Sequence, residues 1–241
     1  MENSDFINNA SLIKSWRIKL SLMLLTILLA IISCINAPSY AYAGGSLYLQ
    51  HLGTLVLMLP LALELRHQRL PVSACVCLFI FACIHILGAR YCYSHVPYDE
   101  WAKNLLNIEI NIKGYWVIKV EGTGVMHGNK YDRLVHFAFG LLMFPLVFQL
   151  TKRIGNGGNF FLALLVAWLT IQTFSMVYEL FEWILSILLS PEQTERYNGQ
   201  QGDMWDAHKD MALALLGSTI SAICICLFHL QKRRKQLHSP E

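Results

Sequence analysis

Six apolar stretches along the chain are each long enough to cross a lipid bilayer. A transmembrane helix needs about 20 predominantly apolar residues, and the runs that meet this requirement lie at residues 18–35, 47–63, 71–89, 134–150, 160–182 and 207–229. Lipid offers no partner for backbone N–H and C=O groups, which a helix satisfies internally. The pattern therefore predicts an all-α fold, a polytopic membrane helix bundle of about six transmembrane helices.

The composition agrees with a membrane-embedded chain. Of the 241 residues, 55% are hydrophobic, and the mean hydropathy of +0.42 exceeds that of ordinary soluble proteins. The net charge of +3 is small, and the basic residues fall in short clusters instead of one stripe, so no nucleic-acid partner is expected. Membrane lipid is the expected surrounding, and the sequence assigns no protein partner.

Basic residues occupy every second connection between the apolar stretches. They are Lys14, Arg17 and Lys19, then Arg66 and Arg69, then Lys152 and Arg153, then Lys232, Arg233, Arg234 and Lys235. The positive-inside rule therefore predicts that both termini are cytoplasmic. We expect a cytoplasmic N-terminal segment (1–17), a single transmembrane helical domain (18–230) with an outer loop (90–133), and a basic cytoplasmic tail (231–241).

The first apolar stretch imitates a secretory signal peptide, because basic residues precede it and Ala41-Tyr42-Ala43 follows it. The distance from the apolar run to this Ala-x-Ala is long, and the run extends back through Ile18 to roughly spanning length. We favour a retained first helix, and cleavage is the alternative.

The predicted outer loop contains one segment with strand-like composition. Residues 115–120 are rich in β-branched and aromatic side chains, which fits either a short hairpin or an interfacial segment. An aromatic belt is expected at the membrane interface, made of Trp101, Trp116, Trp183 and Trp205 with Tyr91, Tyr93 and Tyr131.

Ionisable residues gather at the predicted outer ends of the last three apolar stretches. Asp132 and His136 are four residues apart, so a helix places them on one face. In the next stretch a polar stripe with 3-4-3 spacing rises from mid-bilayer toward the outer surface. Its members are Gln172, Ser175, Glu179 and Glu182.

The last apolar stretch carries its acidic residues on a face of small side chains. Asp206 and Asp210 are four residues apart, and Ala214, Gly217 and Ser221 continue the same face. Small residues at this spacing allow helices to pack closely, so Asp210 is predicted to point into the bundle.

Several ionisable side chains at one depth in the membrane predict a functional site, because one alone costs ~2.5–3.5 kcal/mol at a helix centre. Carboxylates and imidazole are ligands for divalent cations, and crowded carboxylates cannot all ionise without one. The expected metal ligands are Asp132, His136, Glu179, Asp206 and Asp210. The candidate catalytic residues are Glu182, as general base, and Glu179, with Arg133 and Arg90 to hold an anionic head group. A divalent metal is the cofactor considered, and its identity is unassigned; a purely structural salt-bridge network is the alternative.

Four ordered motifs resemble the YjdF-like family of bacterial inner-membrane proteins, over roughly residues 45–225. They are His85-x-x-Gly88-Ala89-Arg90-Tyr91-x-Tyr93-Ser94-x-Val96-Pro97, Tyr131-Asp132-Arg133-Leu134-x-His136-Phe137, Tyr178-Glu179-x-x-Glu182-Trp183 and Gln201-Gly202-Asp203-x-Trp205-Asp206-x-x-x-Asp210-Met211. The blocks that begin at Asp132, Glu179 and Asp206 are also similar, more distantly, to VanZ-like membrane proteins. The resemblance implies a multi-pass protein of the bacterial inner membrane and assigns no activity. The stretch between Pro97 and Tyr131 is longer here than the family usually has.

Three functions are compatible with these residues. The first is a metal-assisted enzyme that acts on a lipid or lipid-linked substrate at the outer leaflet. The second is a proton- or cation-coupled transporter or channel, in which the stripe from Gln172 to Glu182 lines a pathway. The third is a non-catalytic membrane assembly protein. The chain has no H-E-x-x-H or G-x-S-x-G motif, so no known catalytic motif decides among them.

Overall fold

Six helices that are long and apolar enough to cross a membrane confirm the predicted helix bundle. The computed structural model describes residues 2–42, 45–108, 117–120, 124–127, 129–155, 158–200 and 202–237. The six are α1 (Glu2–Cys34), α3 (Ser46–His67), α4 (Val72–Arg90), α6 (Tyr131–Ile154), α7 (Phe160–Leu188) and α9 (Asp206–Leu237). The shorter elements are α2 (Ser39–Tyr42), α5 (Tyr98–Leu106), α8 (Pro191–Asn198) and the strands β1 (Val117–Val120) and β2 (Gly124–His127).

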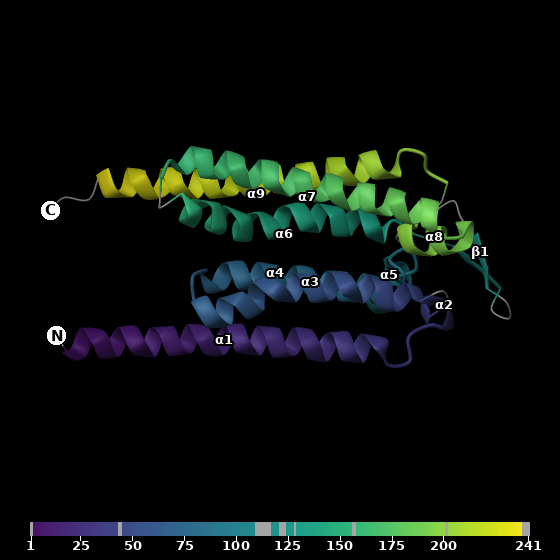
Figure 1. Ribbon diagram of the computed structural model, residues 1–241, viewed down its shortest axis with the longest axis horizontal. Helices are drawn as coiled ribbons and strands as arrows, with labels where there is room; N and C mark the ends of the chain where they lie inside the picture. Colours follow the sequence, from purple (N-terminus) through teal and green to yellow (C-terminus); the bar gives the residue numbers. More distant parts are fainter. Residues whose placement is uncertain are drawn as a thin grey trace.

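The long helices form two layers, with α1, α3 and α4 in one and α6, α7 and α9 in the other (Figure 1). The ends of the chain lie at one end of the bundle, and the short elements α2, α5, α8 and β1 lie at the other (Figure 1). We call this second end the loop end. The strands β1 and β2 pair antiparallel, with Val117 opposite His127. Residues 117–120 of the strand-like segment are therefore one strand of a hairpin. Which end faces the cytoplasm stays a prediction.

Two helices extend beyond the predicted boundaries. Helix α1 begins at Glu2 instead of residue 18, although its apolar span starts only at Ala10. Helix α9 continues through the basic residues to Leu237. Lysine and arginine are good helix formers and favour the negative end of the helix dipole, so the helix need not end where the apolar run ends.

Helices α6 and α9 make the closest contact between the spans. A Cβ atom on Gly140 would lie 2.1 Å from the Ala214 carbonyl oxygen, and one on Gly217 would lie 2.2 Å from that of Phe137. The two backbones therefore touch, which confirms the close packing predicted from the small residues. Both helices run away from the loop end (Figure 1).

Helix α7 runs antiparallel to α9 and is aligned with it by polar contacts. Gln172 Nε2 donates to Ser218 Oγ at 2.9 Å, and Trp168 Nε1 donates to Thr219 Oγ1 at 3.0 Å. From this level, Glu179 lies two turns toward the loop end on α7, and Asp210 lies about two turns toward the same end on α9. The contacts thus bring the acidic residues of both helices to one depth.

Two basic side chains hold helix α1 against its neighbours. Lys19, near the middle of α1, is buried and donates from Nζ to Glu64 Oε2 at 3.0 Å and to the Leu70 carbonyl oxygen at 2.8 Å. At the C-terminal end of α1, Arg90 Nη1 donates to the carbonyl oxygen of Ser33 at 2.8 Å, and its Nη2 donates to that of Asn36 at 3.0 Å. The first apolar stretch is therefore an integral part of the bundle's packing.

Candidate functional site

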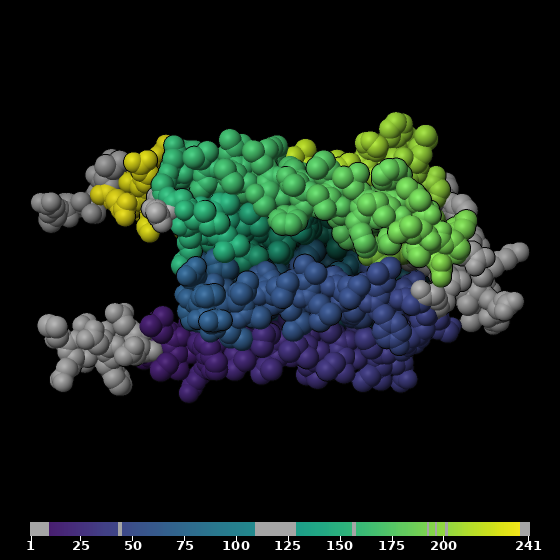
Figure 2. Space-filling model, in the orientation of Figure 1, coloured from purple at the N-terminus to yellow at the C-terminus, as the bar shows by residue number. Residues whose placement is uncertain are grey.

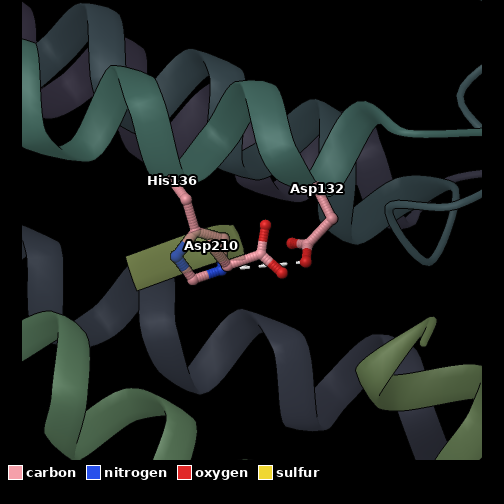
Figure 3. Close-up of side chains that lie close together, drawn as sticks. All are labelled: Asp132, His136 and Asp210. Carbon is pink, nitrogen blue, oxygen red and sulfur yellow. Dashed lines mark ion pairs between the residues drawn. The ribbon is translucent and has the colours of Figure 1, made fainter. Parts of the chain in front are cut away.

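Asp132 and His136 on α6 and Asp210 on α9 converge near the loop end of the bundle (Figure 3). One ligand atom from each side chain can be chosen so that all three lie within 4.8 Å of one another. His136 and Asp210 are buried, and Asp132 is partly buried. The contact at Gly140 and Gly217 explains this meeting, because Gly140 lies one turn beyond His136 on α6 and Gly217 lies two turns beyond Asp210 on α9. We call Asp132, His136 and Asp210 the ligand triad.

Glu179 adds a further carboxylate next to the triad. Its Oε1 lies 3.5 Å from Nε2 of His136, and the same nitrogen lies 3.7 Å from Oδ2 of Asp132. Both distances exceed that of an ordinary hydrogen bond. The imidazole nitrogen thus faces two carboxylates without bonding tightly to either.

Three buried polar atoms in or near the triad have no hydrogen-bond partner within the described part of the chain. They are Oδ1 of Asp210, Oε1 of Glu179 and Oγ of Ser175. A buried polar atom without a hydrogen bond costs ~1–3 kcal/mol, and each case calls for an explanation. The arrangement suits a site that is completed by a bound ion, water or ligand.

The nearby cations lie on the rim of the cluster. Arg133 Nη2 donates to Asp203 at 2.6 Å and to Asp206 at 3.3 Å, and Lys209 Nζ donates to Asp203 at 2.6 Å. The hydrogen bonds from Lys209 and from the Trp205 backbone hold the pKa of Asp203 below its ordinary value. The salt-bridge network considered from the sequence therefore exists at Asp203 and Asp206.

The predicted metal ligands thus fall into two groups. Three of them form the ligand triad, whereas Glu179 flanks it and Asp206 accepts a hydrogen bond from Arg133. Among the candidate catalytic residues, Arg90 is directed to the end of α1. Its contact with an anionic head group stays a prediction.

Glu182 lies among polar and aromatic side chains of α7 and α8. Tyr178 precedes it by one turn on α7, and Tyr197 on α8 packs edge-on against Phe181, with ring centroids 6.1 Å apart. Asn198 Nδ2 donates to the backbone carbonyl of Glu182 at 3.1 Å. Burial raises the pKa of Tyr197, on α8, to about 12, so this phenol stays protonated at neutral pH.

Sequence reasoning gave Tyr178 no role in the site. Tyr178 packs edge-on against His136, with ring centroids 5.7 Å apart, and so connects the triad to Glu182. Tyr93 and Tyr131 were expected in an interfacial belt, but both are buried. Tyr93 is hydrogen-bonded with Nδ1 of His85. The spacing of Tyr178 four residues before Glu182 was the available signal.

An apolar cleft leads from the side of the bundle to the triad. Its volume is about 380 Å³, within the usual range for a ligand site. Figure 2 shows the molecule hollowed between the layer of α3 and the layer of α7. The lining residues come from α3, α4, α6, α7, α8 and the segment after α4. They include Leu52, Val56, Phe174, Ser175, Asp132 and His136.

Six spanning helices around a buried acidic cluster define a multi-pass membrane protein. The chain belongs to the family described as predicted membrane protein (DUF2238), whose sequence profile matches residues 18–231. The inner membrane protein YjdF of Escherichia coli (strain K12) is 29% identical over 182 residues, which cover 75% of this chain and 77% of that protein. No solved structure matches the chain. These comparisons confirm the predicted family and the inner-membrane location.

Proposed function

We propose that Asp132, His136 and Asp210 bind one divalent cation, and that the chain uses it in a metal-assisted reaction on a lipid or lipid-linked substrate. The convergence of three ligand atoms within 4.8 Å carries this proposal. Ligand atoms at about 2.1 Å from a metal lie at most about 4.2 Å apart, so small side-chain rotations complete the site. One imidazole and two carboxylates suit Zn²⁺ or Mn²⁺.

The distribution of charge supports a bound cation. The carboxylates of Asp132, Asp210 and Glu179 lie around the imidazole of His136, while Arg133 and Lys209 pair with Asp203 and Asp206. Three carboxylates at close quarters repel one another in a medium of low dielectric. A dication offsets this repulsion and supplies the missing partner of Asp210 Oδ1. Shared protons are the competing way to neutralise the cluster.

Each flanking residue has a role in such a reaction. A bound metal would polarise a phosphoryl or carbonyl oxygen of the substrate. Glu182, one turn beyond Tyr178 on α7, would act as the general base. Arg133, at the rim, would face an anionic head group. By the positive-inside rule the loop end lies outside, so the substrate would belong to the outer leaflet.

A transporter or channel remains the alternative, but the described spans support it less well. The polar stripe on α7 ends at Gln172, and Phe144, Phe148 and Ile171 fill the bundle with buried apolar side chains. Toward the end of the bundle opposite the loop end, the buried ionisable residues Lys19 and Glu64 bond to each other. A non-catalytic assembly protein is the third candidate, with the cluster serving packing alone.

Metal content tests the proposal directly. The full chain, purified in detergent and loaded with Zn²⁺ or Mn²⁺, is desalted and analysed by elemental mass spectrometry. We expect one metal per chain in the wild type and none in Asp210→Asn. Asp203→Asn is the matched control, since it removes the same charge from the rim and should keep the metal. Absence of metal from a folded wild type, or equal metal in Asp210→Asn, would contradict the proposal.

A further inference from the structure

We infer that the cleft between α3 and α7 binds one hydrocarbon chain of a membrane lipid, with the polar head of that lipid beside Asp132 and His136. This inference rests on the proposed function and names its substrate class. It commits to a lipid tail as the occupant, and the reasons are the surroundings, the lining and the length of the cleft.

The cleft opens into the bilayer. Leu52, Val56 and Phe174 line it, are 55%, 63% and 58% exposed, and belong to membrane-spanning segments. Exposed side chains at this depth face hydrocarbon and not water. An apolar hollow that opens there is filled by the molecules that surround it, which are lipid tails.

The lining is mostly apolar and carries a few polar side chains. Leu49, Leu52, Val56 and Leu57 form the wall on α3, with Phe81, Phe139, Phe174 and Phe181 from the other helices. The polar lining residues are Asp132 and His136 of the triad, Ser175 on α7, and His85, Tyr93, Tyr178 and Tyr197. Ser175 is buried, and its Oγ has no hydrogen-bond partner among the described residues. An amphipathic ligand would satisfy this hydroxyl with its head and the wall with its tail.

The length of the cleft fits one leaflet. Its wall on α3 extends from Leu49 to Leu57, which is about 12 Å along a helix. One leaflet contributes roughly 15 Å to the hydrocarbon core. A tail that enters from the side therefore stays within the depth of its own leaflet while its head reaches the triad.

Gly53 allows His85 on α4 to pack closely against α3. A Cβ atom at this position would lie 2.8 Å from the imidazole Cε1 of His85, so the missing side chain lets the ring lie against α3. Tyr93 fixes the same ring from the opposite side through its hydrogen bond to Nδ1. The wall of the cleft is thus built by specific contacts between α3, α4 and the segment after α4.

Retention of lipid by the purified chain tests the inference. The chain is reconstituted in vesicles of phosphatidylethanolamine and phosphatidylglycerol, with or without a polyprenyl phosphate, extracted gently and examined by native mass spectrometry. We expect one retained lipid per chain in the wild type. The mass identifies its source, a diacyl phospholipid or the polyprenyl phosphate, and either one supports a tail-binding cleft.

Two substitutions one residue apart give a matched comparison. Val56→Trp fills the cleft and should lower retention roughly tenfold. Leu55→Trp adds the same ring at a position that is 60% exposed but does not line the cleft, and should retain the lipid. If Val56→Trp does not fold, as judged by thermal unfolding, Leu52→Phe takes its place. A wild type without retained lipid, or equal retention in both folded variants, would overturn the inference.

The experiment separates this inference from the metal site. Asp210→Asn removes a proposed metal ligand but does not line the cleft, so it should still retain the lipid. Val56→Trp should still bind metal. A wild type that binds metal but retains no lipid would contradict only the lipid-binding cleft. A wild type that retains lipid but binds no metal would contradict only the metal site.

Discussion

Gln172 on α7 donates a hydrogen bond of 2.9 Å to the hydroxyl of Ser218 on α9. The bond fixes the axial position of two antiparallel helices, two turns from the level at which Glu179 approaches the ligand triad. A polar contact in the middle of the bundle therefore decides which acidic residues meet at its end.

Gln172→Leu should weaken both the bundle and the metal site. Interhelical hydrogen bonds in membranes contribute about 0.6–1.7 kcal/mol, so we expect a lower Tm in detergent and a higher Kd for Zn²⁺. Thr173→Val is the control, because among the described residues the Thr173 hydroxyl donates within α7, to the Leu169 carbonyl oxygen. Equal Tm and Kd in Gln172→Leu and Thr173→Val would show that the contact does not align the helices.

Gly140→Ala should separate α6 from α9. The added methyl group meets backbone atoms and not a flexible side chain, and overpacking of this kind costs ~1–3 kcal/mol. We expect a lower Tm together with loss of metal, since the triad spans this interface. Gly155→Ala serves for comparison, because its Cβ would stand 3.5 Å from the nearest atom, the Thr151 carbonyl oxygen. An unchanged metal content in Gly140→Ala would be evidence against the proposed origin of the site.

His95 should make stability depend on pH. Burial lowers its pKa to about 4, whereas an unfolded histidine titrates near ~6.5. Between these values the unfolded chain binds more protons than the folded chain, so stability falls as the pH falls. The contribution is at most about 1.4 kcal/mol per pH unit.

The measurement is Tm between pH 7 and pH 4.5 for the wild type and His95→Gln. The Tm of His95→Gln should fall less steeply than that of the wild type as the pH is lowered. His67→Gln, at an exposed histidine near the other end of the bundle, is the control and should keep the slope. Parallel curves for the wild type and His95→Gln would contradict the prediction.

Cysteine labelling tests the orientation. Leu105 on α5 is 82% exposed at the loop end, and Lys235 lies near the opposite end of α9. We expect Leu105→Cys to react with a membrane-impermeant maleimide on spheroplasts, and Lys235→Cys to react only after the membrane is opened. The reverse pattern would place the triad in the cytoplasmic leaflet.

Periodicity predicted the spans and the faces of the site helices, because both depend on residues close in sequence. Asp132 and His136 share a face in any helix. Gly217 predicts that another helix packs closely against α9, but the sequence does not show that this helix is α6. The partner of Arg90, by contrast, is the end of α1, more than 50 residues earlier. The role of Tyr178 and the existence of the cleft also depend on which helices lie side by side. Sequence spacing within one helix carries no such information.

The bonds of Lys19 have a consequence for biosynthesis. Lys19 leaves the ribosome well before Glu64 and Leu70, so its ammonium group has no partner within the chain until α3 and the following turn are made. The completed contacts join α1 to the turn between α3 and α4. We therefore expect α1, α3 and α4 to leave the insertion machinery as one assembled unit, onto which the three site-bearing helices are added later.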